Sequence, residues 1–172
     1  MATASPEPRA ELLPSTLAHT APMSWAEARR RLGGGDWYSW LSTEHPSGRP
    51  HTRPVLAVWL DDTLYFVANA GSRKARNLVR TPACSVALAT SDAHLVVEGT
   101  AAIQRDARVL QRVADLYLSK YDWHVAIQAG AFHGEGAPTA GPSPYDVYAL
   151  RPTYIYGFGV SESWSPTRWR FG

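Results

Sequence analysis

The stretch Gly71-Ser72-Arg73-Lys74-Ala75-Arg76-Asn77 decides how this chain is interpreted. It follows the apolar run 64–68, which predicts a buried strand, and it opens a short helix that Thr81-Pro82 ends. Its glycine loosens the backbone, its serine is a typical N-cap, and three cations fall within the first helical turn. The helix dipole disfavours cations there, and an anion bound among them removes the conflict. The stretch therefore predicts a phosphate site, and a solvated basic turn is the other interpretation.

Composition indicates a single soluble globular domain. The chain has 172 residues, 45% of them hydrophobic and 19% charged, so it can bury a full core without disulfides or metals. The formal net charge is only +2, which argues against nucleic acid as the main partner. The single cysteine, Cys84, cannot form an internal disulfide and lies in an apolar run, so we expect an inert thiol and a cytoplasmic location. No apolar run is long enough to span a membrane.

The N-terminal part divides into an arm and the start of the domain. Residues 1–22 are rich in Ala, Pro, Thr and Glu without a period, which predicts a mostly disordered arm. Residues 23–172 are expected to form the domain. Ser24 and Glu27 have the spacing of a capping box, which predicts a helix that continues to about Leu32 and is ended by the glycines at 33–35.

Most of the remaining chain reads as strands joined by short turns. The predicted strands are 36–43, 51–60, 63–68, 83–90, 94–103, 145–150 and 153–158, and residues 106–120 form an amphipathic helix. Aromatic residues on both faces of 36–43 predict a strand that is covered on both sides. Pro54 marks an edge or an interruption, Gly99 marks a bulge or a close approach, and the long Gly/Pro-rich loop 121–144 is either functional or mobile. This order predicts a mainly β, split antiparallel barrel with peripheral helices.

The arrangement of these pieces resembles the pyridoxamine 5′-phosphate oxidase-like superfamily of flavin- and deazaflavin-binding split barrels. The resemblance rests on Arg53-Pro54-Val55 in one strand, a hairpin into a second strand, and then Ser-Arg-Lys-x-Arg-Asn-Leu from Ser72. It covers about residues 37–150, and the Thr-Arg-Trp-Arg-Phe ending is similar as well. The resemblance implies a homodimer with two cofactor sites at the subunit interface, and FMN or the deazaflavin coenzyme F420 as cofactor.

The resemblance also implies roles for individual residues. Arg53, Pro54 and Val55 would lie along the edge of the isoalloxazine ring, partly through backbone groups. The phosphate would be held by Ser72, Arg73, Lys74 and Arg76, and Asn77 would brace that turn. The tail 159–172, through Trp164, Arg168 and Trp169, is expected to approach a cofactor site of its own or the other subunit. The alternative is that the tail only caps the open end of its own barrel.

The function that follows is a flavin- or deazaflavin-dependent oxidoreductase that carries out a two-electron step on a small organic substrate. A true pyridoxamine 5′-phosphate oxidase, and a non-catalytic barrel that carries flavin or haem, are the alternatives. The cofactor performs the chemistry, and no residue is identified as catalytic. The histidines are scattered without metal-ligand spacing, so no metal site is predicted.

Overall fold

The computed structural model describes residues 7–14, 21–34, 38–135, 141–160 and 164–172, which form eleven strands and three helices. The helices are α1 (Trp25–Gly33), α2 (Arg73–Arg80) and α3 (Ala107–Tyr121). The strands are β1 (Arg9–Leu12), β2 (Tyr38–Glu44), β3 (Pro50–Pro54), β4 (Ala57–Leu60), β5 (Thr63–Ala68), β6 (Ala83–Ala89), β7 (Ala93–Ile103), β8 (Ala126–Gln128), β9 (Ala131–His133), β10 (Asp146–Gly159) and β11 (Thr167–Arg170).

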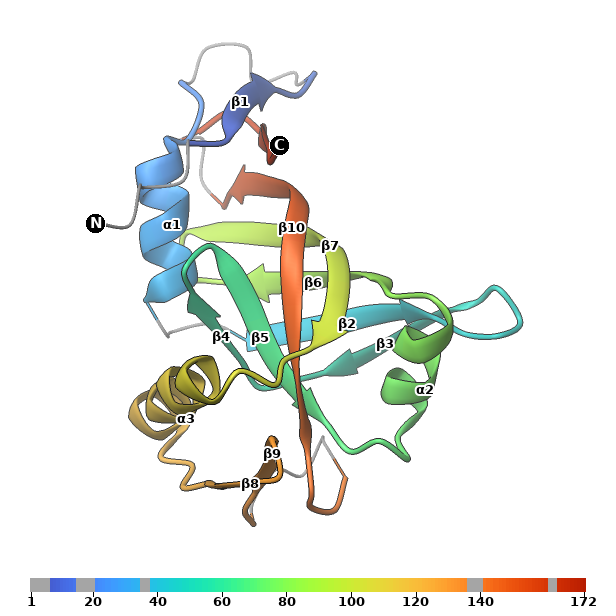
Figure 1. The fold of residues 1–172 in the computed structure, drawn as a ribbon. Coiled ribbons are helices and arrows are strands. Elements are labelled where there is room, and N and C mark those ends of the chain that lie inside the picture. Colours follow the sequence, from blue (N-terminus) through green and yellow to red (C-terminus); the bar gives the residue numbers. More distant parts are fainter. Residues whose placement is uncertain (1–6, 15–20, 35–37, 136–140, 161–163) are drawn as a thin grey trace.

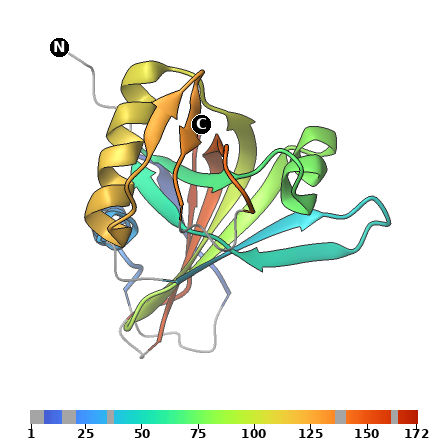
Figure 2. The ribbon, with the colours of Figure 1, turned by 90° about the horizontal axis from the view of Figure 1, so that it is seen from below.

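Nine strands form one antiparallel sheet that folds around the long strand β10 (Figure 1). The sheet runs in the order β1-β11-β10-β7-β6-β2-β3, and β5 pairs with both β10 and β4. The remaining two strands, β8 and β9, pair with each other, and Phe132 of β9 also bridges to Tyr145 just before β10. Helices α2 and α3 lie on different sides of the sheet, and the loop between β2 and β3 projects from the body in both views (Figures 1 and 2). This mainly β arrangement with helices at its periphery agrees with the predicted split barrel.

Two of the predicted strand boundaries are wrong. Residues 145–150 and 153–158 belong to the single strand β10, in which the pairing with β7 shifts between Pro152 and Tyr154. A glycine permits this continuity, because a Cβ atom on Gly99 would stand 2.0 Å from the carbonyl oxygen of Arg151. The bulge or close approach that Gly99 predicted is therefore confirmed. Conversely, residues 51–60 form two strands, β3 and β4, with the break directly after Pro54.

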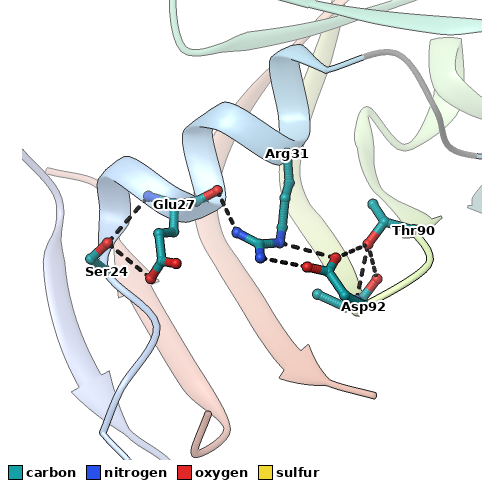
Figure 3. Close-up of polar contacts among 6 residues, drawn as sticks. Ser24, Glu27, Arg31, Thr90 and Asp92 are labelled. Atoms are coloured by element: carbon teal, nitrogen blue, oxygen red, sulfur yellow. Dashed lines mark hydrogen bonds and ion pairs between the residues drawn. The ribbon is translucent and has the colours of Figure 1, made fainter. Parts of the chain in front are cut away.

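The first helix forms as its capping box predicts. The Ser24 side chain accepts a hydrogen bond from the backbone amide of Glu27, and its hydroxyl lies 3.3 Å from the Glu27 carboxylate (Figure 3). The helix ends at Gly33, with Gly34 as C-cap. Near its end, the buried Arg31 donates to both carboxylate oxygens of Asp92, at 2.6 and 3.2 Å, and so ties α1 to the turn between β6 and β7.

The expectation of a mostly disordered arm fails for Arg9–Leu12. These residues form β1, which pairs with β11 over its whole length, and the amide of Leu13 donates to the carbonyl of Pro166. The composition of residues 1–22 does not predict this strand, because its partner strand lies near the other end of the sequence. The rest of the predicted arm is partly outside the described residues.

The core has two parts, one on each side of the β5–β10 region. The larger part contains α1 and the C-terminal strand, and the smaller part is covered by α3 and the β8–β9 hairpin. The prediction that the strand around 36–43 is covered on both sides is wrong for the isolated chain. Ser39, Leu41 and Thr43 of β2 are buried, whereas Tyr38 is 79% exposed and Trp40 is 40% exposed.

Candidate anion and cofactor site

The turn that leads into α2 is held by side-chain hydrogen bonds of two residues. Ser72 is the N-cap, as predicted, and accepts from the backbone amide of Ala75 at 3.2 Å. Asn69 accepts from the backbone amide of Gly71 at 2.7 Å and donates to the carbonyl of Pro142 at 2.8 Å. Sequence reasoning did not identify Asn69. Its position two residues before a glycine, which is typical of an Asx turn, was the available signal.

Helix α2 divides the residues of the basic stretch between two faces. Lys74 and Asn77 share the buried face, and Lys74 is only 5% exposed. Arg73 and Arg76 lie on the exposed face, one turn apart. Asn77 donates from Nδ2 to the hydroxyl of Thr43 at 3.0 Å, so it fixes α2 against β2. This contact corrects the expectation that Asn77 braces the preceding turn, which Asn69 does.

Strand β3 places two further basic side chains on the side of the sheet that α2 covers. Arg53 is paired with Leu41 and His51 with Thr43 across the β2–β3 ladder. Directly opposed residues in an antiparallel pair point to the same face, and Leu41 and Thr43 are buried on the inner face. Arg53 and His51 therefore project toward the same side as the contact between Thr43 and α2.

Two basic side chains in this region, Lys74 and His51, have lowered pKa values, so their surroundings disfavour the charged forms. Burial, followed by the nearby charge of Arg53, lowers the pKa of Lys74. Burial is also the largest cause of the lowered pKa of His51, and Arg53, His45 and Lys74 contribute to it. Cations that are buried and mutually repelled are stabilised when an anion lies among them. Here Arg53 and Lys74, with Arg73 and Arg76 nearby on α2, form what we call the basic cluster.

A further observation fits a polar ligand in this region. The Oδ1 atom of Asn77 is buried and has no hydrogen-bond partner among the described residues, although Asn77 is only 1% exposed. Buried amide oxygens normally have a donor, so an unsatisfied one calls for an explanation such as a missing water or ligand. The basic cluster and the helix N-terminus have the donor chemistry that suits a phosphate group, whereas the Asn77 oxygen is an acceptor and suits a donor such as water.

The bend after Pro54 offers less free backbone than the sequence indicated. The amide of Val55 donates to the carbonyl of Ser39 at 3.1 Å, and the hydroxyl of Ser39 donates to the carbonyl of Val55 at 2.6 Å. Both backbone groups of Val55 are therefore occupied within the chain. Helix α3 holds the next two residues: Tyr117 donates to the carbonyl of Leu56, and Tyr121 bonds the amide and the carbonyl of Ala57.

The three tail residues make different contacts within the chain, and none of these contacts is with the basic cluster. Trp169 is fully buried in the core and packs against Trp25 of α1, with ring centroids 5.8 Å apart and ring planes inclined by 56°. Trp164 packs on the guanidinium of Arg31, which lies 4.4 Å from the ring centroid. Arg168 pairs with Glu11 of β1 and lies over the ring of Tyr154. In this chain the tail thus closes the end of its own sheet, which is the alternative that the sequence left open.

The outer face of the sheet carries a separate groove. It has a volume of about 530 Å³, and Ser42, Ser85, Glu98 and Tyr154 form one row across it. The neighbouring rows include the exposed aromatic side chains Tyr38, Trp40 and Phe158. Alternation along β2 puts this groove and the basic cluster on opposite faces of the sheet.

The remaining findings concern the Cys84 thiol, metal sites and membrane-spanning helices. Burial raises the pKa of the Cys84 thiol to about 12, so the thiol is protonated at neutral pH and a poor nucleophile. Within the described ranges, no three His, Cys, Asp or Glu side chains are grouped as a metal site requires. The helices of the described residues include none that is long and apolar enough to cross a membrane.

Comparison with known proteins agrees with this architecture. The profile of the family described as "Pyridoxamine 5′-phosphate oxidase" matches residues 37–158, which is more than half of the chain. A conserved hypothetical protein of Mycobacterium tuberculosis has a similar structure, with a TM-score of 0.63 and 19% identity over 86% of this chain and 92% of that one. No curated protein sequence matches the chain.

Two other solved structures share the fold. A heme binding protein from Mycobacterium smegmatis aligns with a TM-score of 0.58 and 20% identity, over 81% of this chain and 55% of that one. An F420 reductase aligns with a TM-score of 0.51 and 19% identity, over 73% of this chain and 94% of that one. Because the family profile spans both the β3–β5 strands and the basic helix, this chain belongs to the pyridoxamine 5′-phosphate oxidase family.

Proposed function

We propose that this protein is an oxidoreductase that binds FMN or the deazaflavin F420 and carries out a two-electron redox step on a small organic substrate. The observation that carries the proposal is the buried Lys74 beside Arg53 at the N-terminus of α2. Two neighbouring cations beside the first backbone amides of a helix attract an anion, and a phosphate group forms charge-assisted hydrogen bonds with both kinds of donor. The family membership and the F420 reductase with the same fold support a cofactor of this class.

The residues of the chain have distinct roles in this proposal. Lys74, Arg53, Arg73 and Arg76 bind the phosphate of the cofactor, and Ser72 fixes the turn in which the first amides of α2 face the anion. The bend at Pro54 borders the ring, and its shape is set by Ser39 and by the tyrosines of α3. When bound, the flavin or deazaflavin supplies the ring that accepts or donates a hydride. The protein then orients the ring and the substrate and excludes water.

The proposal includes a homodimer in the cytoplasm, with the cofactor at the subunit interface. The outer face of the sheet, which lies opposite the basic cluster, supports the homodimer itself, because Tyr38, Trp40 and Phe158 leave an apolar surface exposed in the single chain. Contiguous apolar surface of this kind is normally covered by a partner. A second copy of the chain covers it and brings further residues, such as Arg168 beside the groove, toward the interface.

Spectroscopic titration of the purified protein tests the proposal. FMN, F420 and haem are added separately, and binding is followed by absorbance and fluorescence. We expect FMN or F420 to bind, and Lys74→Met to weaken that binding by about tenfold or more, because one charge-assisted hydrogen bond is worth roughly 1.5–3 kcal/mol. The matched control is Arg29→Met, which removes an exposed cation of α1 and leaves the affinity unchanged.

The outcomes separate the candidate functions. Unchanged affinity in Lys74→Met, or no binding of either FMN or F420, contradicts the proposal. Tight binding of haem alone favours the non-catalytic carrier, in keeping with the heme binding protein that shares the fold. If a cofactor binds, turnover with its reduced form and added acceptors distinguishes an enzyme from a carrier. Oxidation of pyridoxamine 5′-phosphate by the FMN-loaded protein identifies a true pyridoxamine 5′-phosphate oxidase.

A further inference from the structure

The imidazole of His51 lies beside the basic cluster and is linked to α2 through two side chains. Its Nδ1 atom is 3.5 Å from the hydroxyl oxygen of Thr43. That same oxygen accepts the hydrogen bond from Nδ2 of Asn77 and lies 3.4 Å from the carbonyl oxygen of His51. A chain of contacts therefore runs from α2 across β2 to β3. Sequence reasoning treated His51 as one of several scattered histidines and gave it no role.

Among the described residues, the charged groups that act on His51 from the surrounding elements are basic. Arg53 follows it on the same face of β3, His45 lies just after β2, and Lys74 projects from the buried face of α2. The side chain of His51 is itself half-buried. A histidine in these surroundings is neutral at pH 7 while the site is empty of anions. An anion among Lys74 and Arg53 reverses the sign of the local potential at the ring.

We propose that His51 is part of the anion site formed by Lys74 and Arg53, and that an anion binds there together with a proton on the His51 ring. The proposal rests on the function proposed above only in that both use the same site. The proton comes from solvent, no bond is made or broken in the ligand, and the protonated ring becomes a further donor to the anion. His51 is therefore a binding residue, and it makes the affinity of the site dependent on pH.

The direction of the pH dependence follows from linkage. The site without an anion has a lowered His51 pKa, and the bound anion raises it, so the complex holds more protons than the free protein. Affinity then increases as the pH falls through the interval between the raised and the lowered pKa. Below the lowered value the dependence disappears, because His51 is protonated in both states.

Sulfate is a suitable probe because it keeps its charge between about pH 5 and 8, the range in which histidine titrates. The full-length protein is labelled with carbon-13 at the histidine rings, and each ring is titrated by NMR with and without sulfate. The NMR signal of His51 is assigned as the one that is lost in the variant His51→Gln. Sodium chloride at equal ionic strength is the essential control, since screening alone also raises the pKa of a histidine near cations. His94, exposed on the outer face of β7, serves as the internal reference.

We expect saturating sulfate to raise the His51 midpoint by about half a unit or more beyond the effect of chloride. We further expect Lys74→Met to abolish this additional shift, and the sulfate affinity of His51→Gln to lose its dependence on pH. Equal shifts in sulfate and chloride overturn the proposal, as does an unaltered shift in Lys74→Met.

Sulfate and cofactor titrations of the same protein distinguish this inference from the proposed function. A sulfate-specific shift of His51 in a protein that binds neither FMN nor F420 supports the anion site and contradicts the cofactor. Cofactor binding that requires Lys74 but leaves the His51 midpoint unchanged supports the cofactor and overturns the role of His51. Because the phosphate of FMN itself titrates near neutral pH, the cofactor experiment compares wild type with His51→Gln at each pH.

Discussion

Removing the Arg31 side chain tests how strongly α1 is fixed to the rest of the sheet. The guanidinium donates two hydrogen bonds to Asp92 and one, at 3.1 Å, to the carbonyl of Glu27 (Figure 3). It also packs on the ring of Trp164. The side chain of Arg31 is 7% exposed and that of Asp92 is 51% exposed, so the ion pair is only partly shielded from solvent. The substitution Arg31→Leu keeps most of the apolar stem and removes these polar contacts.

The expected cost is about 3 kcal/mol. Hydrogen bonds between charged groups contribute roughly 1.5–3 kcal/mol when buried, and we take the lower part of that range because half of Asp92 is exposed. The contact of the guanidinium with the ring adds about 0.5–1 kcal/mol. For a chain of this size, a loss of about 3 kcal/mol lowers the melting temperature by roughly 6–12 °C. Urea denaturation followed by tryptophan fluorescence measures the free energy, and calorimetry measures the temperature.

Arg29→Leu is the matched control on the same helix. Arg29 also pairs with an aspartate, Asp62, but its side chain is 55% exposed, and such pairs contribute about 0–1 kcal/mol. If Arg31→Leu and Arg29→Leu lower the stability equally, the reasoning from burial is refuted.

The Arg31 effect also has a defined pH dependence. The hydrogen bond from Arg31 is the largest cause of the lowered pKa of Asp92 in the folded protein. A lowered folded-state pKa means that the stabilisation is fully present above the unfolded value, which is 3.8 for this group, and is lost as the pH falls through the folded value. The difference between wild type and Arg31→Leu is therefore expected to be constant near neutral pH and to shrink below that ordinary value. A difference that grows on acidification contradicts the assignment.

Three further outcomes are expected. Gly99→Ala destabilises the protein severely, because the added methyl group meets the carbonyl oxygen of Arg151; a normal melting temperature disproves this close approach. Trp169→Ala costs about 3–5 kcal/mol in urea denaturation, since the ring is fully buried, and a loss below about 1 kcal/mol indicates that the tail is dispensable for stability. Sedimentation at low micromolar concentration gives twice the chain mass of 18.9 kDa for wild type and a monomer for Trp40→Arg; a wild-type monomer contradicts the proposed interface.

Local signals in the sequence were sufficient for the elements around the site. Ser24, Ser72 and Gly99 each have a role that depends on near neighbours or on backbone shape, and the structure confirms each one. Local signals also predicted the pairing of strands that are close in sequence, such as β4 with β5.

Features that depend on distant partners were not predicted. Strand β1 has no recognisable pattern of its own, because its order comes from β11. Alternation along β11 sends Trp169 into the core and Arg168 to the outer face, and sequence reasoning had grouped both with the cofactor site. The sequence did not predict a role for His51, because its surroundings come from β2, β3 and α2. Only the β2–β3 register and the packing of α2 bring these elements together.

The pairing of β1 with β11 has a consequence for biosynthesis. Residues of β1 leave the ribosome long before Thr167–Arg170, the residues with which they pair. Domains generally begin to fold from the N-terminus during synthesis. Here the position of Trp169 in the core and the partner edge of β1 stay vacant until Thr167–Arg170 have been synthesised. A nascent chain of this protein therefore exposes a tryptophan-sized gap beside α1 until β11 has emerged, and the gap closes only when β11 pairs with β1 and β10.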